Sequence, residues 1–111
     1  MMNLSELRET LRQMLAVLEA ERQALAEMDL DAILGAADNK QALCGTLDQS
    51  NDIELDEECR GLLDAARRLN DVNRQIRNLV AANVSARLDA LTGSAALYRA
   101  APAAAYSVAR R

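Results

Sequence analysis

The feature that most constrains this chain is the stretch from Cys59 to Gly93, the longest helical pattern in the sequence. It contains no proline, and a helix over this range is roughly 50 Å long. Mainly apolar side chains recur there at alternating steps of three and four residues, which places them on one face of a helix: Leu62, Ala66, Leu69, Asn73, Ile76, Val80, Asn83 and Arg87. A face of that length requires partner helices. Thr92-Gly93 is predicted to end the helix, because glycine readily adopts the left-handed conformation there.

The composition favours helices throughout the chain. Half of the 111 residues are hydrophobic but only 2% are aromatic, so leucine and alanine supply most of the apolar mass. There is no alternating apolar pattern typical of strands, and no apolar run reaches membrane-spanning length. Charges also interrupt the N-terminus, where a secretory signal would be apolar. We therefore predict an all-α protein, an antiparallel bundle of about three helices with a very long third helix, located in the cytoplasm without membrane insertion.

The first helix has a clear predicted start and end. Asn3 is a suitable N-cap, and Glu6 completes a capping box. An apolar heptad then runs to Met28, and Glu21 is its one interruption. Asp29 or Asp31 can cap the second helix. The sequence leaves open whether the joint between them is a turn or a kink in one nearly continuous arm.

The other boundaries follow from composition. Residues 49–52 are turn-forming, and acidic residues cluster before the long helix, where the helix dipole favours them. After Gly93 the chain is rich in alanine and contains Pro102, so it buries little surface. We divide the chain into a helical bundle domain, residues 1–93, and a flexible Ala-rich tail, residues 94–111.

The charges are unevenly distributed. Residues 1–58 carry a net charge of −10 and residues 59–111 carry +6, for a total of −4. This distribution suits an acidic first half packed against a basic third helix. Nucleic-acid binding is disfavoured because the whole chain is acidic, aromatic stacking residues are lacking, and the arginines are spread around the helix.

Side chains for catalysis or metal binding are scarce. The chain has no histidine, no phosphate-binding glycine loop and no nucleophile motif, so we expect no enzyme, no catalytic residues, no cofactor and no metal site. Cys44 and Cys59 lack metal-ligand spacing and are expected to be reduced thiols. Both lie near the predicted turn, where they could face each other.

Polar residues in the long helix have two interpretations. Asn73 and Asn83 lie on the apolar face and Asn70 lies beside it. They either set the register of a buried core, as asparagine does in coiled coils, or mark a surface left open for a partner's backbone. Tyr98 likewise either folds back on the bundle or is an exposed anchor for a partner.

Several segments, taken in order over residues 4–98, resemble the FlgN-type flagellar export chaperones. A leucine-rich first helix is followed by MDLDAIL and NKQAL, and then by a long helix containing RRLNDVNRQI, RLDALTG and a final Leu97-Tyr98. Asn70 and Asn73 match the asparagine pair of the family. The resemblance implies a C-terminal tyrosine that contacts the export gate. The segment LYRAAPAAAY departs from the family pattern, so this tyrosine is either Tyr98 or Tyr106.

This resemblance implies a cytosolic chaperone that binds the C-terminal helical regions of hook–filament junction proteins. It would deliver them to the flagellar export gate or ATPase complex. We expect an apolar groove that accepts the partner helix, with the tail closing over it. The expected partner-binding residues are Leu69, Asn70, Asn73, Ile76, Val80, Leu88, Leu97 and Tyr98. The alternatives are a self-assembling structural coiled-coil subunit and a related export chaperone for another flagellar substrate.

Overall fold

The structure is a computed structural model that describes residues 2–50 and 52–98, the side chains of residues 94–98 excepted. It contains three α-helices, α1 (Leu4–Glu27), α2 (Leu30–Leu47) and α3 (Glu57–Tyr98), with a short 3₁₀ turn, η1 (Asp48–Ser50), after α2. The predicted all-α class and the very long third helix are confirmed. The chain divides into two compact units, Met1–Arg77 and Asn78–Arg111.

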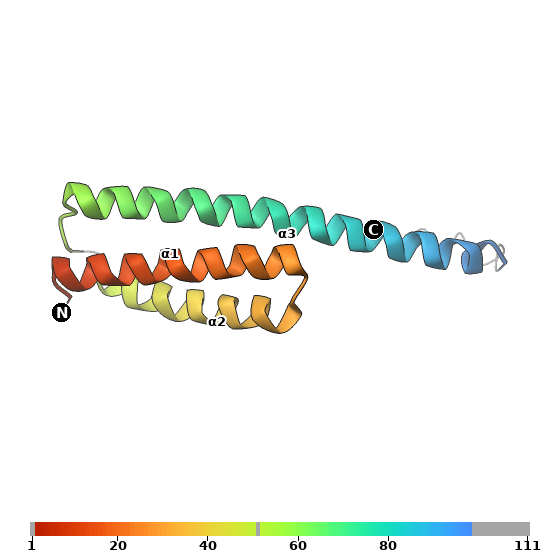
Figure 1. Ribbon diagram of the computed structural model, residues 1–111, viewed down its shortest axis with the longest axis horizontal. Coiled ribbons are helices and arrows are strands. Elements are labelled where there is room, and N and C mark those ends of the chain that lie inside the picture. The colour runs from red at the N-terminus through yellow and green to blue at the C-terminus, as the bar shows by residue number, and fades with distance from the viewer. Residues whose placement is uncertain (1, 51, 99–111) are drawn as a thin grey trace. The chain divides into compact units, whose positions relative to one another are not determined.

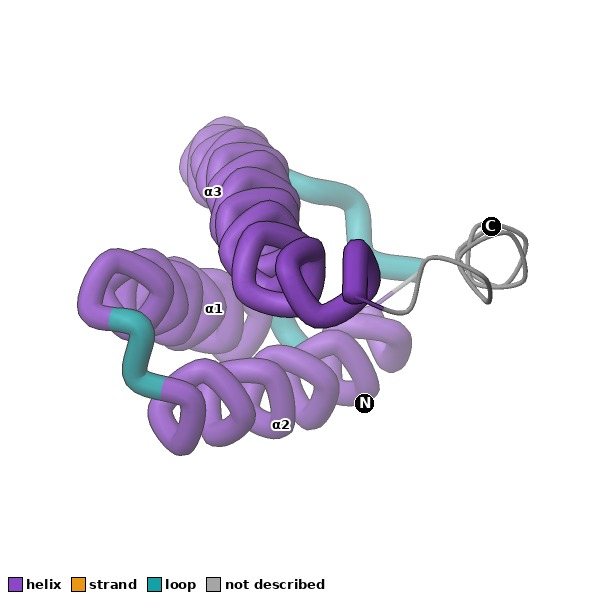
Figure 2. Tube along the Cα trace, turned by 90° about the vertical axis from the view of Figure 1, so that its right-hand side faces the viewer, coloured by secondary structure: helices purple, strands orange, loops and turns teal. Residues whose placement is uncertain are grey.

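The first unit is a three-helix bundle in which consecutive helices run antiparallel (Figures 1 and 2). α1 supplies most of the buried residues, whereas α2 buries only Ala36. The core has two clusters of buried side chains, Leu7 with Leu11 and Cys59, and Met14 with Leu18 and Ala66. Each fully buried leucine contributes about 1.5–3 kcal/mol to folding, so α1 supplies most of the core. Leu43 and Leu47 of α2 pack against these clusters from partly buried positions.

The first two helices are separate, and their ends follow the predicted signals. Asn3 Oδ1 accepts a hydrogen bond from the Glu6 amide at 2.8 Å, and the capping box is complete. Met28 adopts the left-handed conformation, with φ 57°, and ends α1. Asp29 then caps α2 by accepting from the Ala32 amide at 3.1 Å. The chain therefore reverses at Met28, and the alternative of one continuous arm is excluded.

The start of α3 is also capped by a carboxylate. Asp56 lies directly before the helix, and its Oδ1 accepts a hydrogen bond from the Cys59 amide at 2.8 Å. Its backbone carbonyl accepts from the Arg60 amide at 3.0 Å, as the first helical bond. The acidic cluster predicted at this end, which includes Glu57 and Glu58, occupies the first turn.

The prediction that Thr92-Gly93 ends the long helix is wrong. α3 continues through Gly93 to Tyr98, and no described glycine has a positive φ. A glycine inside a helix costs only about 1 kcal/mol, and the residues that follow it are good helix formers. The remainder of the predicted tail, residues 99–111 with Tyr106, lies outside the described residues, as do the side chains of Leu97 and Tyr98.

The second unit contains the last part of α3. The side chains of residues 81–92 are all exposed. The exposed large apolar side chains of this unit are Leu79, Val84, Leu88 and Leu91. Thr92 Oγ1 donates to the Leu88 carbonyl at 2.8 Å within the helix. Among the described residues, no helix is both long and apolar enough to cross a membrane.

Candidate functional site

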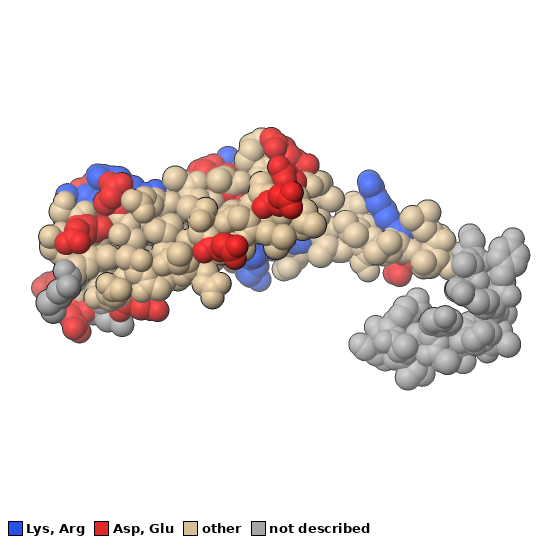
Figure 3. Space-filling view, turned by 90° about the horizontal axis from the view of Figure 1, so that it is seen from below, with Lys and Arg blue, Asp and Glu red and all other residues tan. Residues whose placement is uncertain are grey.

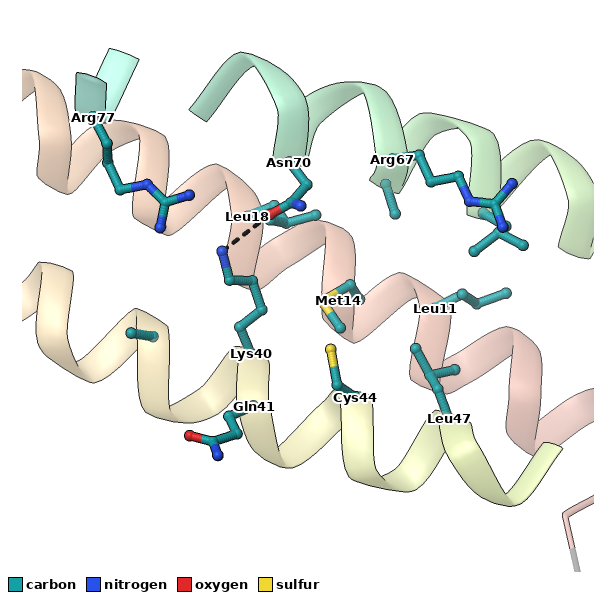
Figure 4. A pocket seen from close by; sticks show the side chains of 13 residues that line it. Leu11, Met14, Leu18, Lys40, Gln41, Cys44, Leu47, Arg67, Asn70 and Arg77 are labelled. Carbon is teal, nitrogen blue, oxygen red and sulfur yellow. Dashed lines mark hydrogen bonds between the residues drawn. The ribbon is translucent and has the colours of Figure 1, made fainter. Parts of the chain in front are cut away.

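A cavity of about 430 Å³ opens on the first unit between α2 and α3, and α1 forms its floor (Figure 4). This volume lies within the usual range of ligand-binding clefts. All three helices line it, with residues Leu11, Met14, Leu18, Ala37, Lys40, Gln41, Cys44, Leu47, Leu63, Ala66, Arg67, Asn70 and Arg77. We call this cavity the groove.

The floor of the groove is apolar. Leu11, Met14 and Leu18 reach it from α1, where they are also buried members of the core, with relative exposures of 2%, 5% and 1%. Met14 and Cys44 point toward each other across the groove (Figure 4). Flexible methionine side chains adapt well to different apolar partners, so this floor can accommodate side chains of more than one shape.

The wall contributed by α2 is also largely apolar. Ala37, Gln41 and Cys44 follow helical spacing and lie on one face. The same spacing extends toward the start of α2 through Leu34 and Leu30, which are 56% and 66% exposed. The surface over α2 is mostly uncharged, with acidic side chains in separate patches (Figure 3). An uncovered apolar face of this kind is typical of a binding surface.

The wall contributed by α3 differs from the α2 wall in charge. Leu63, Arg67, Asn70 and Arg77 follow the same helical spacing along the groove. Both arginines reach the groove, whereas no carboxylate is among its described lining residues. The α2 wall also contains Lys40, but its ammonium group is engaged by Glu21 and Asn70, so the two walls differ in the positive charge that they leave available.

A buried polar cluster closes the groove on its inner side. Glu21 is only 1% exposed, and its carboxylate accepts hydrogen bonds from Lys40 Nζ at 3.1 and 3.2 Å and from Asn73 Nδ2 at 2.9 Å. Arg77 Nη1 lies 3.8 Å from Glu21 Oε2. A buried carboxylate is tolerated only when it is paired and hydrogen-bonded, and these three partners from α2 and α3 meet that requirement.

Asn70 and Asn73, which match an asparagine pair of the family, have different environments in the structure. Asn73 is fully buried, and its Nδ2 also donates to the Leu18 carbonyl at 2.9 Å. Because both of its neighbours are acceptors, the orientation of this amide is fixed. Asn70 is exposed, lines the groove and accepts from Lys40 Nζ at 3.0 Å. Asn73 therefore fits the first of its two interpretations, a register-setting core residue, whereas Asn70 lies at the groove.

The other predicted partner-binding residues are distributed over both units. Leu69 packs against the Met14–Leu18–Ala66 cluster, and Ile76 is half-buried in the first unit. Val80 and Leu88 belong to the second unit, where Leu88 is exposed. Of the predicted residues with described side chains, Asn70 alone lines the groove.

Sequence reasoning missed most of the groove. Its floor residues, Leu11, Met14 and Leu18, were predicted only as part of the apolar heptad of the first helix, and neither Lys40 nor Arg67 was predicted to bind a partner. One signal was present: a single acidic residue, Glu21, interrupts the heptad of α1, and a buried acid requires a cation nearby. The only lysine of the chain, Lys40, fills that role from α2.

The two cysteines have different environments. Cys44 is exposed in the groove, whereas Cys59 is buried beside Leu7 and Leu11, and both thiols are free. Burial raises the pKa of the Cys59 thiol, with a further contribution from Asp56. Reactivity requires an accessible thiolate, so Cys44 is the reactive cysteine of the pair.

A second charged cluster holds the start of α3 against α1. Arg8 contacts Asp56 at 3.3 Å and Glu58 at 3.1 Å, and Arg12 contacts Glu58 at 2.7 Å. Glu58 is the main cause of the raised pKa of Arg8, and the Cys59 amide is the main cause of the lowered pKa of Asp56. The sequence predicts that the acidic first half packs against a basic third helix. In the described part of the chain, Arg77 and Glu21 form the only ion pair of this kind.

Comparison of this chain with protein-family models, with curated proteins and with solved structures finds no match. The residues of the groove are therefore the basis for inferring a function.

Proposed function

We propose that the protein is a flagellar export chaperone that binds a C-terminal helical region of a hook–filament junction protein in the groove. It would keep that region from associating prematurely and deliver it to the export gate or ATPase complex. The observation that carries this proposal is a groove between α2 and α3 with an apolar floor on α1, beside which Ala37 and Cys44 of α2 are exposed.

The groove has the chemistry expected of a surface that accepts the apolar face of a helix. Its two walls are helices that follow the same spacing of lining residues, and its floor is a third helix. A fourth helix laid on these ridges would complete a four-helix bundle. Amphipathic helices bind other proteins in this way, by placing their apolar face in a hydrophobic groove.

The choice of partner comes from the resemblance to FlgN-type chaperones. Two elements of that resemblance are close to the groove: Lys40 in NKQAL joins α2 to α1, and Asn70 in RRLNDVNRQI lines the α3 wall. These residues supply polar contacts beside an apolar floor. A helical tail that would otherwise associate with its own kind is a suitable ligand for such a surface.

The proposal is tested by mass measurement in solution. Multi-angle light scattering would be applied to the protein alone and mixed with the C-terminal fragment of a junction protein. We expect a discrete heterocomplex. A mixture that shows only the masses of its separate components would contradict the proposal, and binding of another flagellar substrate in place of junction proteins would redirect it to a related chaperone.

A self-assembling coiled-coil subunit is the second candidate. It is favoured by three exposed apolar side chains of the second unit that share one face of α3 at helical spacing, Val84, Leu88 and Leu91. The same light-scattering series separates the candidates, because self-assembly through this face predicts a mass that rises with the concentration of the protein alone.

A further inference from the structure

We infer that the groove selects amphipathic helices that carry carboxylates along the flank facing α3, with their apolar face against α1 and α2. This inference rests on the proposed function and states which helices the groove prefers. It follows from the unequal charge of the two walls.

The α3 wall presents cations that the protein itself does not fully neutralise. Arg67 is exposed and forms no ion pair within the described part of the chain. Arg77 has a side chain that is 41% exposed, and it lies 3.8 Å from Glu21, beyond hydrogen-bonding distance. Both guanidinium groups therefore retain donors for a carboxylate of a bound partner.

Lys40 does not contribute to this selection, although it lines the groove. Its ammonium group already donates to both oxygens of Glu21 and to Asn70 Oδ1. The positive charge available to a partner is thus confined to the α3 wall. Arg67 and Arg77 are separated by about 15 Å along the helix axis, so they match carboxylates about three turns apart on a partner helix.

The α2 wall fixes the orientation of the occupant about its own axis. Ala37 and Cys44 line this wall, Gln41 is its neutral polar member, and Leu34 continues its exposed face. A charged flank placed against this wall would lose hydration without gaining a partner. A bound helix therefore places its apolar face here and its acidic flank toward Arg67.

The inference is tested with synthetic amphipathic peptides that share one leucine stripe and carry glutamate, glutamine or lysine along one flank. Calorimetric titrations would use the full chain and two charge-reversal variants, R67E and R68E. Arg68 is the matched control because it is exposed and follows Arg67 directly, yet it points about 100° away around the helix and does not line the groove.

We expect the glutamate peptide to bind the wild-type chain about two- to five-fold more tightly than the glutamine peptide. The lysine peptide should bind more weakly than either, and raised salt should reduce these differences. R67E should reverse the preference, and R68E should retain it. Equal binding of the three peptides, equal effects of the two substitutions, or no binding of any peptide would overturn the inference.

Binding of a junction-protein fragment to the same variants tests the proposed function separately from the charge selection. A junction-protein fragment that fails to bind, while the glutamate peptide binds in an Arg67-dependent way, supports the charge selection and contradicts the flagellar assignment. A fragment that binds equally to wild-type, R67E and R68E chains supports the assignment and contradicts the charge selection.

Discussion

Lys40 Nζ lies 3.1 Å from Glu21 Oε2, and this ion pair joins α2 to the most buried face of α1. The same ammonium group donates to Asn70 Oδ1 on α3 at 3.0 Å. One side chain therefore links all three helices at the inner edge of the groove. Because α2 has only one buried residue of its own, Ala36, this link fixes the position of the α2 wall.

Loss of the Lys40 ammonium group should destabilise the bundle. Lys40→Met leaves the Glu21 carboxylate buried with Asn73 and a distant Arg77, and breaking a buried pair on one side is costly. We expect the free energy of unfolding, measured by urea denaturation, to fall by about 2–4 kcal/mol.

The control for this prediction replaces both partners. In the double variant Glu21→Leu with Lys40→Met, no buried charge is left unpaired, because Arg77 is 41% exposed to solvent, so most of the lost stability should return. A double variant as unstable as the sum of its single variants would contradict the role assigned to this pair.

Asn73 and Asn70 should respond differently to the same substitution. Asn73→Ala removes two hydrogen bonds from a fully buried site and leaves the Leu18 carbonyl without this donor, so we expect a loss of about 2–3 kcal/mol. Asn70→Ala removes one bond at an exposed position and should cost under about 1 kcal/mol. Chemical denaturation of both variants measures the difference, and equal losses would be inconsistent with this structure.

These asparagines also show how far the sequence predicts the fold. Helical spacing placed Asn73 on the apolar face and ended the first helix near Met28. Capping patterns predicted Asn3 as the first N-cap and Asp29 as one of two candidates for the second, because these features depend on neighbours within a few residues. The sequence did not predict the groove, because its walls are set by how α2 and α3 diverge over α1. The sequence pattern also predicted that the long helix ends at Gly93, whereas α3 continues to Tyr98. Local propensity alone does not decide whether a helix continues through a glycine.

The cap of α3 should make stability depend on pH in the acid range. The pKa of Asp56 is lowered in the folded state, so its carboxylate stabilises the protein above its unfolded pKa of about 3.9. That contribution is lost as the pH falls through the folded pKa. Asp56→Asn keeps the capping oxygen but removes the charge beside Arg8, so it should lower the stability at pH 7.

Urea denaturation of wild-type and Asp56→Asn proteins between pH 7 and pH 2 checks this. The stability difference should shrink in acid, while the pKa of Asp71, lowered by Arg74, gives both proteins the same residual acid dependence. A difference that stays constant with pH would rule out a charge contribution from Asp56.

The two thiols should differ in reactivity with a maleimide. Cys44 is exposed in the groove and should be labelled rapidly in the native protein, whereas buried Cys59 should react only after unfolding. Mass spectrometry of the labelled chain identifies the site. A bound helix should slow labelling of Cys44, and a Cys44 that reacts at the same rate with and without a bound junction-protein fragment would place the partner outside the groove.

The most direct test of the central claim is calorimetric titration of a junction-protein C-terminal fragment into groove and control variants. Ala37 and Ala42 are both exposed on α2, but only Ala37 lines the groove, so A37E places a charge on its apolar wall and A42E does not. We predict that A37E weakens binding about tenfold or more, because the added carboxylate must be desolvated, and that A42E binds like the wild type. Equal, undiminished binding by both variants would contradict the assignment of the groove as the site for a partner helix.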